Sequence, residues 1–470
     1  MTALAALTVV GGLFVVFSRL ESSGHSAAVV GVVFGVILLD AVLYENQNEV
    51  PIGLFHPEYE KQTFRLPDIL IPVAILACLL RRPRAPSSPV VLVWLAFLAW
   101  LTTAGLVGVY EGNPLSIVAF QGKAIIYLGA FLVAASVPVG QYLADGRIER
   151  YLGWSAALAL LMIATSVTGA TLNADFPLLP LRNFGVMGAD AATIFSGLGV
   201  IALALALLES DRRRWPLLAS ASVLLATPAF ADQRAAFIGL GVAVAIVVAT
   251  MLLTRRTVSV TPTEALLAAG ALAALLLVST VPAVVADRPV KLPLQDQLST
   301  TFGSYEEVLT TQDRVNQWAQ AGPLIAERPV YGHGLGYQYV FWNQGFYEFT
   351  QTDLTHNIFA DLLLRSGIVG LGLFLIAFGA TWLGVARAWR SACPARTAAF
   401  GLGVAAAVTG IVGKGMAESV FEKYRLAAAL GLGIGVMISA GRAGRAPAAP
   451  RALAPERRAL TETQGAASTW

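Results

Sequence analysis

Long apolar runs recur along the whole chain, and they restrict its possible folds more than any other feature. Runs such as 89–110, 189–208 and 235–253 contain hardly any charged residues, and a helix of about 20 apolar residues spans the hydrocarbon core of a bilayer. The 470-residue chain is 56% hydrophobic but only 13% charged, whereas soluble domains are about 25% charged. The runs are continuous and do not alternate with polar residues, so they favour helices over barrel strands. The sequence therefore predicts an all-α polytopic membrane protein that is embedded in a lipid bilayer.

The runs indicate 12 or 13 transmembrane helices, because the first and third are short enough to lie partly in the membrane interface. They fall at residues 4–18, 27–44, 67–80, 89–110, 117–138, 151–171, 189–208, 216–231, 235–253, 264–286, 367–386, 398–416 and 425–440. Arginine-rich loops alternate with poorly basic ones along this series, and the positive-inside rule assigns the arginine-rich side to the cytoplasm. The C-terminus is then cytoplasmic, and the N-terminus lies outside with 13 spans or inside with 12.

This orientation divides the chain into four regions. They are N-terminal transmembrane helices at 1–286, an extracytoplasmic loop domain at 287–355, C-terminal transmembrane helices at 356–440, and a disordered basic cytoplasmic tail at 441–470. Within the loop domain, we expect a helix near residues 310–327. The G-x-G spacings at 332–336 and 431–435 follow no strand, so they are not dinucleotide fingerprints. The sequence carries no nucleic-acid signature. Its acidic residues are scattered, and we predict neither a metal nor a cofactor.

Five cations lie close to the membrane on the outer side, where the chain is otherwise acidic. They are Lys123, Arg182, Arg234, Arg365 and Lys414. Cations from five separate segments at one depth can form an anion site, and the guanidinium group suits phosphate because it donates two hydrogen bonds at once. The alternative is that each cation extends to the interface or pairs locally. Carboxylates stand near three of them in the sequence, at Asp232, Asp361 and Glu418.

His356 is the best acid–base candidate in the sequence. It lies in a polar triplet, Thr355 to Asn357, at the start of an apolar run on the outer side. Imidazole titrates near neutral pH and can accept a proton from a hydroxyl group. An ordinary capping or packing role for the triplet is the alternative. A second histidine, His333, lies between two glycines and is better explained as a turn residue than as a ligand contact.

Aromatic residues crowd the outer loop. Trp318, Tyr337 and Trp342 are the candidates for binding sugar rings, whose C–H faces are apolar and whose edges carry hydroxyl groups. The same rings can instead form the core of the loop domain or lie in the interfacial belt of aromatic residues. Both roles remain open from the sequence.

Several motifs occur in a familiar order. They are R-N-F-G at 182–185, Q-R-A-A-F-I-G-L-G at 233–241, R-V-N-Q-W at 314–318, R-P-V-Y-G-H-G-L-G at 328–336 and T-H-N-I-F-A-D-L-L-L-R-S-G at 355–367. From about residue 90 to residue 440, the chain resembles the O-antigen ligase and polymerase superfamily of bacterial envelope enzymes. The histidine-containing motif is the most specific part of this resemblance.

The resemblance implies a GT-C-like membrane glycosyltransferase in the bacterial plasma membrane. Such an enzyme takes a glycan from an undecaprenyl-diphosphate carrier on the outer face and transfers it to a hydroxyl of a glycan, lipid or protein acceptor, with inversion and without a metal. By position, Arg182 and Arg234 match the arginines that contact the diphosphate, His356 matches the histidine that positions or deprotonates the acceptor, and Arg314 matches the loop arginine. One departure is that Arg234 follows Gln233 and precedes Ala235, where the family usually has Ser or Thr and then Gly.

Three interpretations compete at this stage. Within the glycosyltransferase class, a polymerase and a ligase are about equally supported, because nothing in the sequence identifies the acceptor. A polysaccharide or lipid transporter or flippase would place charged or broken helices at the middle of the membrane in two halves, whereas here the polar groups gather on the outer side. A structural scaffold would leave Arg182, Arg234 and His356 unexplained.

Overall fold

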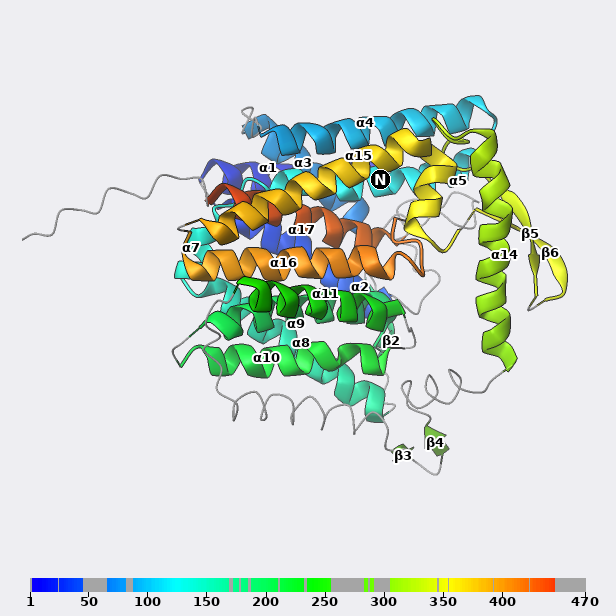
Figure 1. Cartoon of the computed structure of the whole chain (residues 1–470). Helices are drawn as coiled ribbons and strands as arrows, with labels where there is room; N and C mark the ends of the chain where they lie inside the picture. The colour runs from blue at the N-terminus through cyan, green and yellow to red at the C-terminus, as the bar shows by residue number, and fades with distance from the viewer. Residues whose placement is uncertain are drawn as a thin grey trace, which may run out of the picture.

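Long helices lying side by side make up most of the molecule (Figure 1). The computed structural model describes residues 2–23, 25–44, 66–81, 88–168, 172–176, 179–184, 187–209, 212–231, 235–254, 283–285, 288–290, 305–344, 346–353, 355–391, 393–421 and 423–443. The predicted span at 264–286 lies almost wholly outside these residues, as does the tail after residue 443.

The helices follow the apolar runs closely, and α4 and α9 coincide with the predicted spans 89–110 and 189–208. The helices are α1 (Thr2–Ser22), α2 (Ser26–Tyr44), α3 (Leu66–Arg81), α4 (Pro89–Tyr110), α5 (Leu115–Leu128), α6 (Phe131–Ala134), α7 (Val139–Ala144), α8 (Arg147–Thr168), α9 (Ala189–Leu208), α10 (Arg214–Ala226), η1 (Thr227–Phe230), α11 (Ala235–Thr254), α14 (Tyr305–Glu327), α15 (Ile358–Arg390), α16 (Ala395–Lys414) and α17 (Tyr424–Ala443).

Seven helical segments in the described part of the chain are long and apolar enough to cross a membrane. They are α4, Leu115–Ala134 (α5 and α6 together), α9, α11, α15, α16 and α17. The shorter apolar helix Ser26–Val42 adds to them. The prediction of an all-α polytopic membrane protein is confirmed, while the number of 12 or 13 spans stays a prediction.

The two ends of the bundle differ in character (Figure 1). At one end, which we call the α7 end, Arg396 pairs with Glu149 and Glu209 and donates to the Leu143 carbonyl at 3.2 Å. At the other, the α14 end, helix α14 lies across the ends of the membrane helices. The positive-inside rule predicts that the α7 end faces the cytoplasm.

Three small antiparallel hairpins accompany the helices. They pair β1 (Leu172–Phe176) with β2 (Leu179–Phe184), β3 (Ala283–Val285) with β4 (Arg288–Val290), and β5 (Tyr339–Asn343) with β6 (Glu348–Thr352). None of the three hairpins was predicted from the sequence. In β5 the side chains alternate between faces, so Tyr339 and Phe341 are buried and Val340 is exposed, as expected for a strand with one covered face.

Helix α15 is two helices joined at Gly367. This residue has φ +66° and ψ −170°, which breaks the helical conformation. A Cβ atom there would lie 2.2 Å from the Val330 carbonyl oxygen, so only glycine fits. The segment from Ile358 to Ser366 is therefore a separate short helix at the α14 end, and the long apolar helix begins after the break.

A glycine-rich segment, residues 331–336, ties α14 and the β5–β6 hairpin to the bundle. The amides of His333, Gly334 and Leu335 donate to the carbonyls of Leu364, Arg365 and Ala104 at 2.8, 3.1 and 2.9 Å. Gly332, Gly334 and Gly336 all have positive φ, between +70° and +82°. The motif Y-G-H-G-L-G thus forms a structural clamp between α4 and α15.

Gly334 is the tightest point of this clamp to test. A Cβ atom there would lie 2.3 Å from the Gly108 amide nitrogen, and its φ of +82° disfavours any side chain. We expect Gly334→Ala to reduce the amount of folded protein in the membrane severalfold and to lower its unfolding temperature in detergent. Gly322→Ala is the matched control, because Gly322 lies inside α14 with open space around it and alanine favours helix by about 1 kcal/mol. Equal stability of both variants would contradict the clamp.

Candidate functional site

The backbone of His356 adopts a conformation that few residues other than glycine take. Its φ is +47°, which costs a residue with a side chain about 1–2 kcal/mol. The buried Thr355 donates from Oγ1 to the Asn357 carbonyl at 3.0 Å. Asn357 caps α15, and its Oδ1 accepts from the amides of Phe359 and Ala360. Asn357 therefore performs the capping role, and the imidazole of His356 has no hydrogen-bond partner among the described residues.

Helix α14 brings a cation and an aromatic ring to the same turn. Trp318 donates from Nε1 to the Thr355 carbonyl at 2.9 Å, and Arg314 lies one turn earlier on the same face of α14. Within the described part of the chain, Arg314 has neither a hydrogen bond nor an ion pair, and its side chain is partly exposed. The structure thus brings together three residues that the sequence singled out: His356, Arg314 and Trp318.

The surroundings of His356 favour its neutral form, because they lower the pKa of the imidazole. Burial is the largest effect that lowers the pKa of His356 below its usual value, and the Arg314 guanidinium is the next largest. Lys423 acts in the same direction, while Glu418 opposes the shift without reversing it. A neutral imidazole that is not engaged in a hydrogen bond can accept a proton from a hydroxyl group.

Residues 415–421 and 423, which lie between α16 and α17 and which we call the 415–423 loop, pack against the start of α15. The Ile358 amide donates to the Gly415 carbonyl at 2.7 Å, and Asn357 donates from Nδ2 to the Met416 carbonyl at 3.2 Å. These two hydrogen bonds fix the loop beside the His356 turn.

Among the described residues, a cluster of six charged side chains joins this loop to four helices, α2, α9, α16 and α17, at the α14 end. Its members, which we call the buried charge cluster, are Asp40, Asp190, Lys414, Glu418, Lys423 and Arg425. Lys414 Nζ lies 3.3 Å from Glu418 Oε2 and 3.6 Å from Asp190 Oδ1. Arg425 Nε lies 2.6 Å from Asp40 Oδ2. Three carboxylates balance three cations, so the cluster as a whole is neutral.

Three of the five predicted phosphate-binding cations lie against carboxylates. Lys414 is fully buried in the charge cluster. Arg365 pairs with Asp361 at 2.9 Å, and Lys123 pairs with Asp68 at 3.1 Å. Local pairing, the alternative considered for these cations, occurs at Arg365 and Lys414, whereas Lys123 pairs with a carboxylate 55 residues away. Substrate binding by all three stays an untested prediction.

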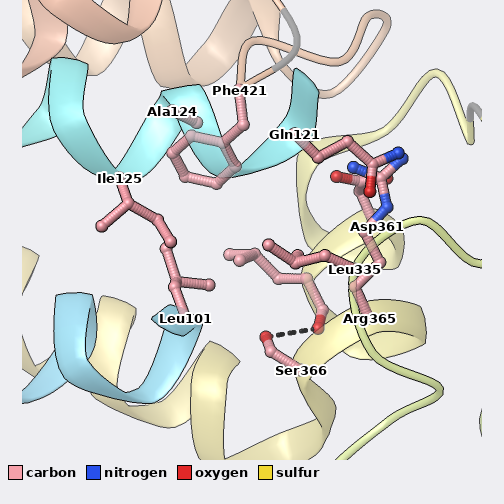
Figure 2. A pocket seen from close by; sticks show the side chains of 10 residues that line it. Leu101, Gln121, Ala124, Ile125, Leu335, Asp361, Arg365, Ser366 and Phe421 are labelled. Carbon is pink, nitrogen blue, oxygen red and sulfur yellow. Dashed lines mark hydrogen bonds and ion pairs between the residues drawn. The ribbon is translucent and has the colours of Figure 1, made fainter. Parts of the chain in front are cut away.

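Beside the Asp361–Arg365 pair lies a small cavity, shown in Figure 2. Polar groups of Gln121, Asp361 and Arg365 gather on one side of it, and apolar side chains such as Phe421 lie on the other. Its volume of about 20 Å³ is enough for roughly one water molecule. A sugar or a diphosphate does not fit in this cavity, so the cavity itself is not the substrate site.

The structure describes little of Arg182 and Arg234, the two arginines that the family resemblance matches to the diphosphate contacts. Arg182 is part of strand β2, whose backbone pairs with β1; the description does not extend to its side chain. Arg234 lies outside the described residues, and helix α11 begins with the next residue, Ala235. Their joint placement with His356 stays a prediction.

The aromatic residues of the loop region divide between a core and an exposed surface. Tyr337 stacks on the buried His333 at 4.2 Å between ring centroids, and His333 contacts the Leu324 carbonyl at 2.8 Å. His333 belongs to the clamp and Tyr337 directly follows the clamp, which agrees with a structural role for His333. Trp342 lies edge-on to the exposed Phe349 at 5.2 Å, and its carbonyl accepts from Asn316 of α14. Trp342 and Trp318 are therefore both held by α14.

The buried charge cluster contains members that the sequence analysis missed. Asp40, within the apolar helix α2, accepts hydrogen bonds from Arg425 and Tyr424, each at 2.6 Å. Asp190 was not singled out, although an acidic residue in the first turn of an otherwise apolar helix is a detectable signal. Among the described residues no group of three or more His, Cys, Asp or Glu side chains is arranged to hold a metal ion.

Comparison with known proteins locates a family match over the same region. Residues 219–375 match the family model described as "O-Antigen ligase". This stretch runs from α10 through α14 and the β5–β6 hairpin to the middle of α15, and it includes Arg234, Arg314 and His356. The resemblance to the O-antigen ligase and polymerase superfamily is confirmed there. No curated protein matches the chain.

Proposed function

We propose that this chain is a membrane glycosyltransferase that moves a glycan from an undecaprenyl-diphosphate carrier to an acceptor hydroxyl at the α14 end of the bundle. One observation carries the proposal: the left-handed turn at His356 holds an imidazole that has no hydrogen-bond partner among the described residues, beside Arg314, which forms no ion pair with any of them. Strained backbone and perturbed titratable groups together are typical of functional sites.

In the proposed reaction the imidazole of His356 accepts the proton of the acceptor hydroxyl as its oxygen bonds to the anomeric carbon. The bond from that carbon to the diphosphate oxygen breaks, and the electron pair leaves with undecaprenyl diphosphate. Arg182, Arg234 and Arg314 stabilise the negative charge that develops on the leaving group. Trp318 and Trp342 offer flat faces to the sugar rings.

An apolar cleft among α2, α8, α9, α16 and α17 supports a lipid-linked donor. Its volume is about 380 Å³, and side chains such as Phe34, Ile201, Val404 and Val436 line it. One end reaches Thr193, whose hydroxyl accepts a hydrogen bond from Lys414 of the buried charge cluster at 3.0 Å. A carrier lipid whose hydrocarbon chain lay in this cleft would hold its charged head group close to the proposed site.

The position of the buried charges favours an enzyme over a transporter or flippase. Asp190, Lys414 and Arg425 all lie in the first or last turn of their helices, whereas transporters place their binding groups near the middle of the membrane. The acceptor, and with it the choice between ligase and polymerase, is left to experiment.

Loss of either diphosphate-contacting arginine tests the proposal. We expect Arg182→Ala and Arg234→Ala each to lower transfer from an undecaprenyl-diphosphate-linked glycan by about 10²–10³-fold, the usual cost of removing one donor to a developing anion. The assay is glycan transfer in membranes with equal amounts of each variant. Arg150→Ala is the control, because Arg150 is an exposed residue in the first turn of α8 at the α7 end and does not line the apolar cleft. Full activity of both arginine variants would refute the proposed site.

Mass analysis of glycans from a deletion strain separates the two acceptor classes. Single repeat units on the final acceptor would identify a polymerase. Long chains left on the carrier lipid would identify a ligase.

The pH profile of transfer tests the role of His356 separately. The imidazole acts as a base only when deprotonated, so activity rises with pH through its pKa and then reaches a plateau. Because burial and Arg314 lower the pKa of His356, we expect the inflection below about 6.5, the usual value for histidine. The charged groups around the imidazole are Arg314, Glu418 and Lys423. Arg314→Met should move the inflection to higher pH; an unchanged inflection would show that another group is titrating.

A further inference from the structure

The 415–423 loop carries a lysine that differs from the other cations of the buried charge cluster. The side chain of Lys414 is fully buried and that of Arg425 is 7% exposed, but that of Lys423 is 29% exposed. The loop is hydrogen-bonded to the His356 turn through Gly415 and Met416. Lys423 is therefore the cluster's cation on the side open to solvent, next to the proposed site.

The ion pairs of Lys423 are also the ones that can be exchanged most easily. Its ammonium contacts Glu418 and lies 3.7 Å from Asp190 Oδ1. Both carboxylates have other partners: Lys414 lies 3.3 Å from Glu418, and Asp190 lies within 3.7 Å of both Lys414 and Arg425. If Lys423 moved away, each carboxylate would still face a cation, so neither would be left as an unpaired buried charge.

We propose that Lys423 is a further anion-binding residue. Its ammonium group moves away from Glu418 and binds a phosphate oxygen of the lipid-linked diphosphate. This inference rests on the proposed function, because it assigns Lys423 to the same donor. Lys423 and Arg314 approach His356 from the 415–423 loop and from α14, so a diphosphate between them is held from two sides. Lysine suits an exchange of partners because its ammonium is a compact charge on a flexible stem.

The second phosphate group is the one that needs an additional cation. A carrier with a diphosphate has more negative charge than the same lipid with a monophosphate, and charge-assisted hydrogen bonds are the strong ones. Lys423 should therefore contribute to the preference for diphosphate over monophosphate.

The test measures binding of two glycan-free lipids, undecaprenyl diphosphate and undecaprenyl phosphate, to the purified full-length chain. We expect Lys423→Met to weaken binding of the diphosphate about ten- to a hundredfold, the usual value of a hydrogen bond to a charged group, and to reduce the preference over the monophosphate. Lys423→Arg should retain the preference. Glu418→Gln should bind the diphosphate at least as tightly as wild type, because it removes the competing carboxylate.

The outcomes separate this inference from the proposed function. Wild-type protein that binds neither lipid would contradict both. Wild-type protein that prefers the diphosphate, together with Lys423→Met showing the same preference, would overturn only the role of Lys423. Weak diphosphate binding by Glu418→Gln, with an unchanged unfolding temperature, would also overturn it, because Lys423 would then serve only to position Glu418. If Lys423→Met does not accumulate, the Lys423→Arg variant decides. A Lys423→Arg protein that has lost the preference for diphosphate over monophosphate overturns the inference, and one that keeps this preference supports it.

Discussion

Replacing His356 with alanine is expected to lower glycan transfer by about 10²–10⁴-fold, the usual contribution of a general base, while the protein accumulates normally. The imidazole has no hydrogen-bond partner among the described residues and does not cap α15, a role that Asn357 performs. Its removal therefore takes away a proton acceptor and little stability. Measurement of initial transfer rates in membranes with matched amounts of protein gives the effect.

Two further variants make the result specific. His356→Asn keeps a residue that adopts the left-handed conformation readily, so it should preserve the turn and still lose transfer. His25→Ala should retain full activity, because His25 is exposed and its ring contacts only Ser23 among the described residues. An active His356→Asn enzyme would show that the backbone turn, and not the imidazole, is what the site requires.

Replacing Lys414 with methionine is expected to remove most of the folded protein. The lysine is fully buried and lies between Asp190 and Glu418, and breaking a buried ion pair by removing one partner costs about 3–5 kcal/mol. The amount of protein in the membrane and its unfolding temperature in detergent should both fall. Arg328→Met serves as the control, because Arg328 and its partner Glu111 are both partly exposed; this variant should unfold close to wild type.

This experiment also decides between two roles for Lys414. The sequence analysis grouped it with cations that bind a phosphate, whereas the structure places it inside the buried charge cluster. A Lys414→Met protein that folds normally but no longer binds undecaprenyl diphosphate would restore the first role.

The sequence predicted the helices well and their interactions poorly, for a physical reason. The membrane requires long uninterrupted apolar helices, so α4 and α9 could be located to the residue. Ion pairs within one turn, such as Asp361 with Arg365, also follow from local spacing. The pair of Asp40 and Arg425 joins the second helix to the last, and no local pattern indicates which distant charge will meet Asp40.

At the candidate site, too, local features could be predicted from the sequence and long-range contacts could not. His356 could be singled out by its polar context, and Arg314 by its motif, but neither the left-handed backbone of His356 nor its position beside Arg314 follows from the sequence. The β5–β6 hairpin was missed because the abundance of aromatic residues in that stretch was interpreted as sugar contacts or a core. The run of Tyr, Val, Phe and Trp at 339–342 was the signal that could have revealed it, because aromatic and β-branched residues are enriched in strands.

The pairing of Asp40 with Arg425 and Tyr424 has a consequence for how the protein is made. Asp40 enters the membrane with the second helix, but its partners are synthesised almost four hundred residues later. Until α17 is inserted, the ribosome-bound chain carries an acidic side chain in α2 that still lacks the hydrogen bonds from Tyr424 and Arg425. Assembly at the α14 end is therefore completed only by the last helix, and chains truncated before α17 should be recognised by membrane quality control as unfinished.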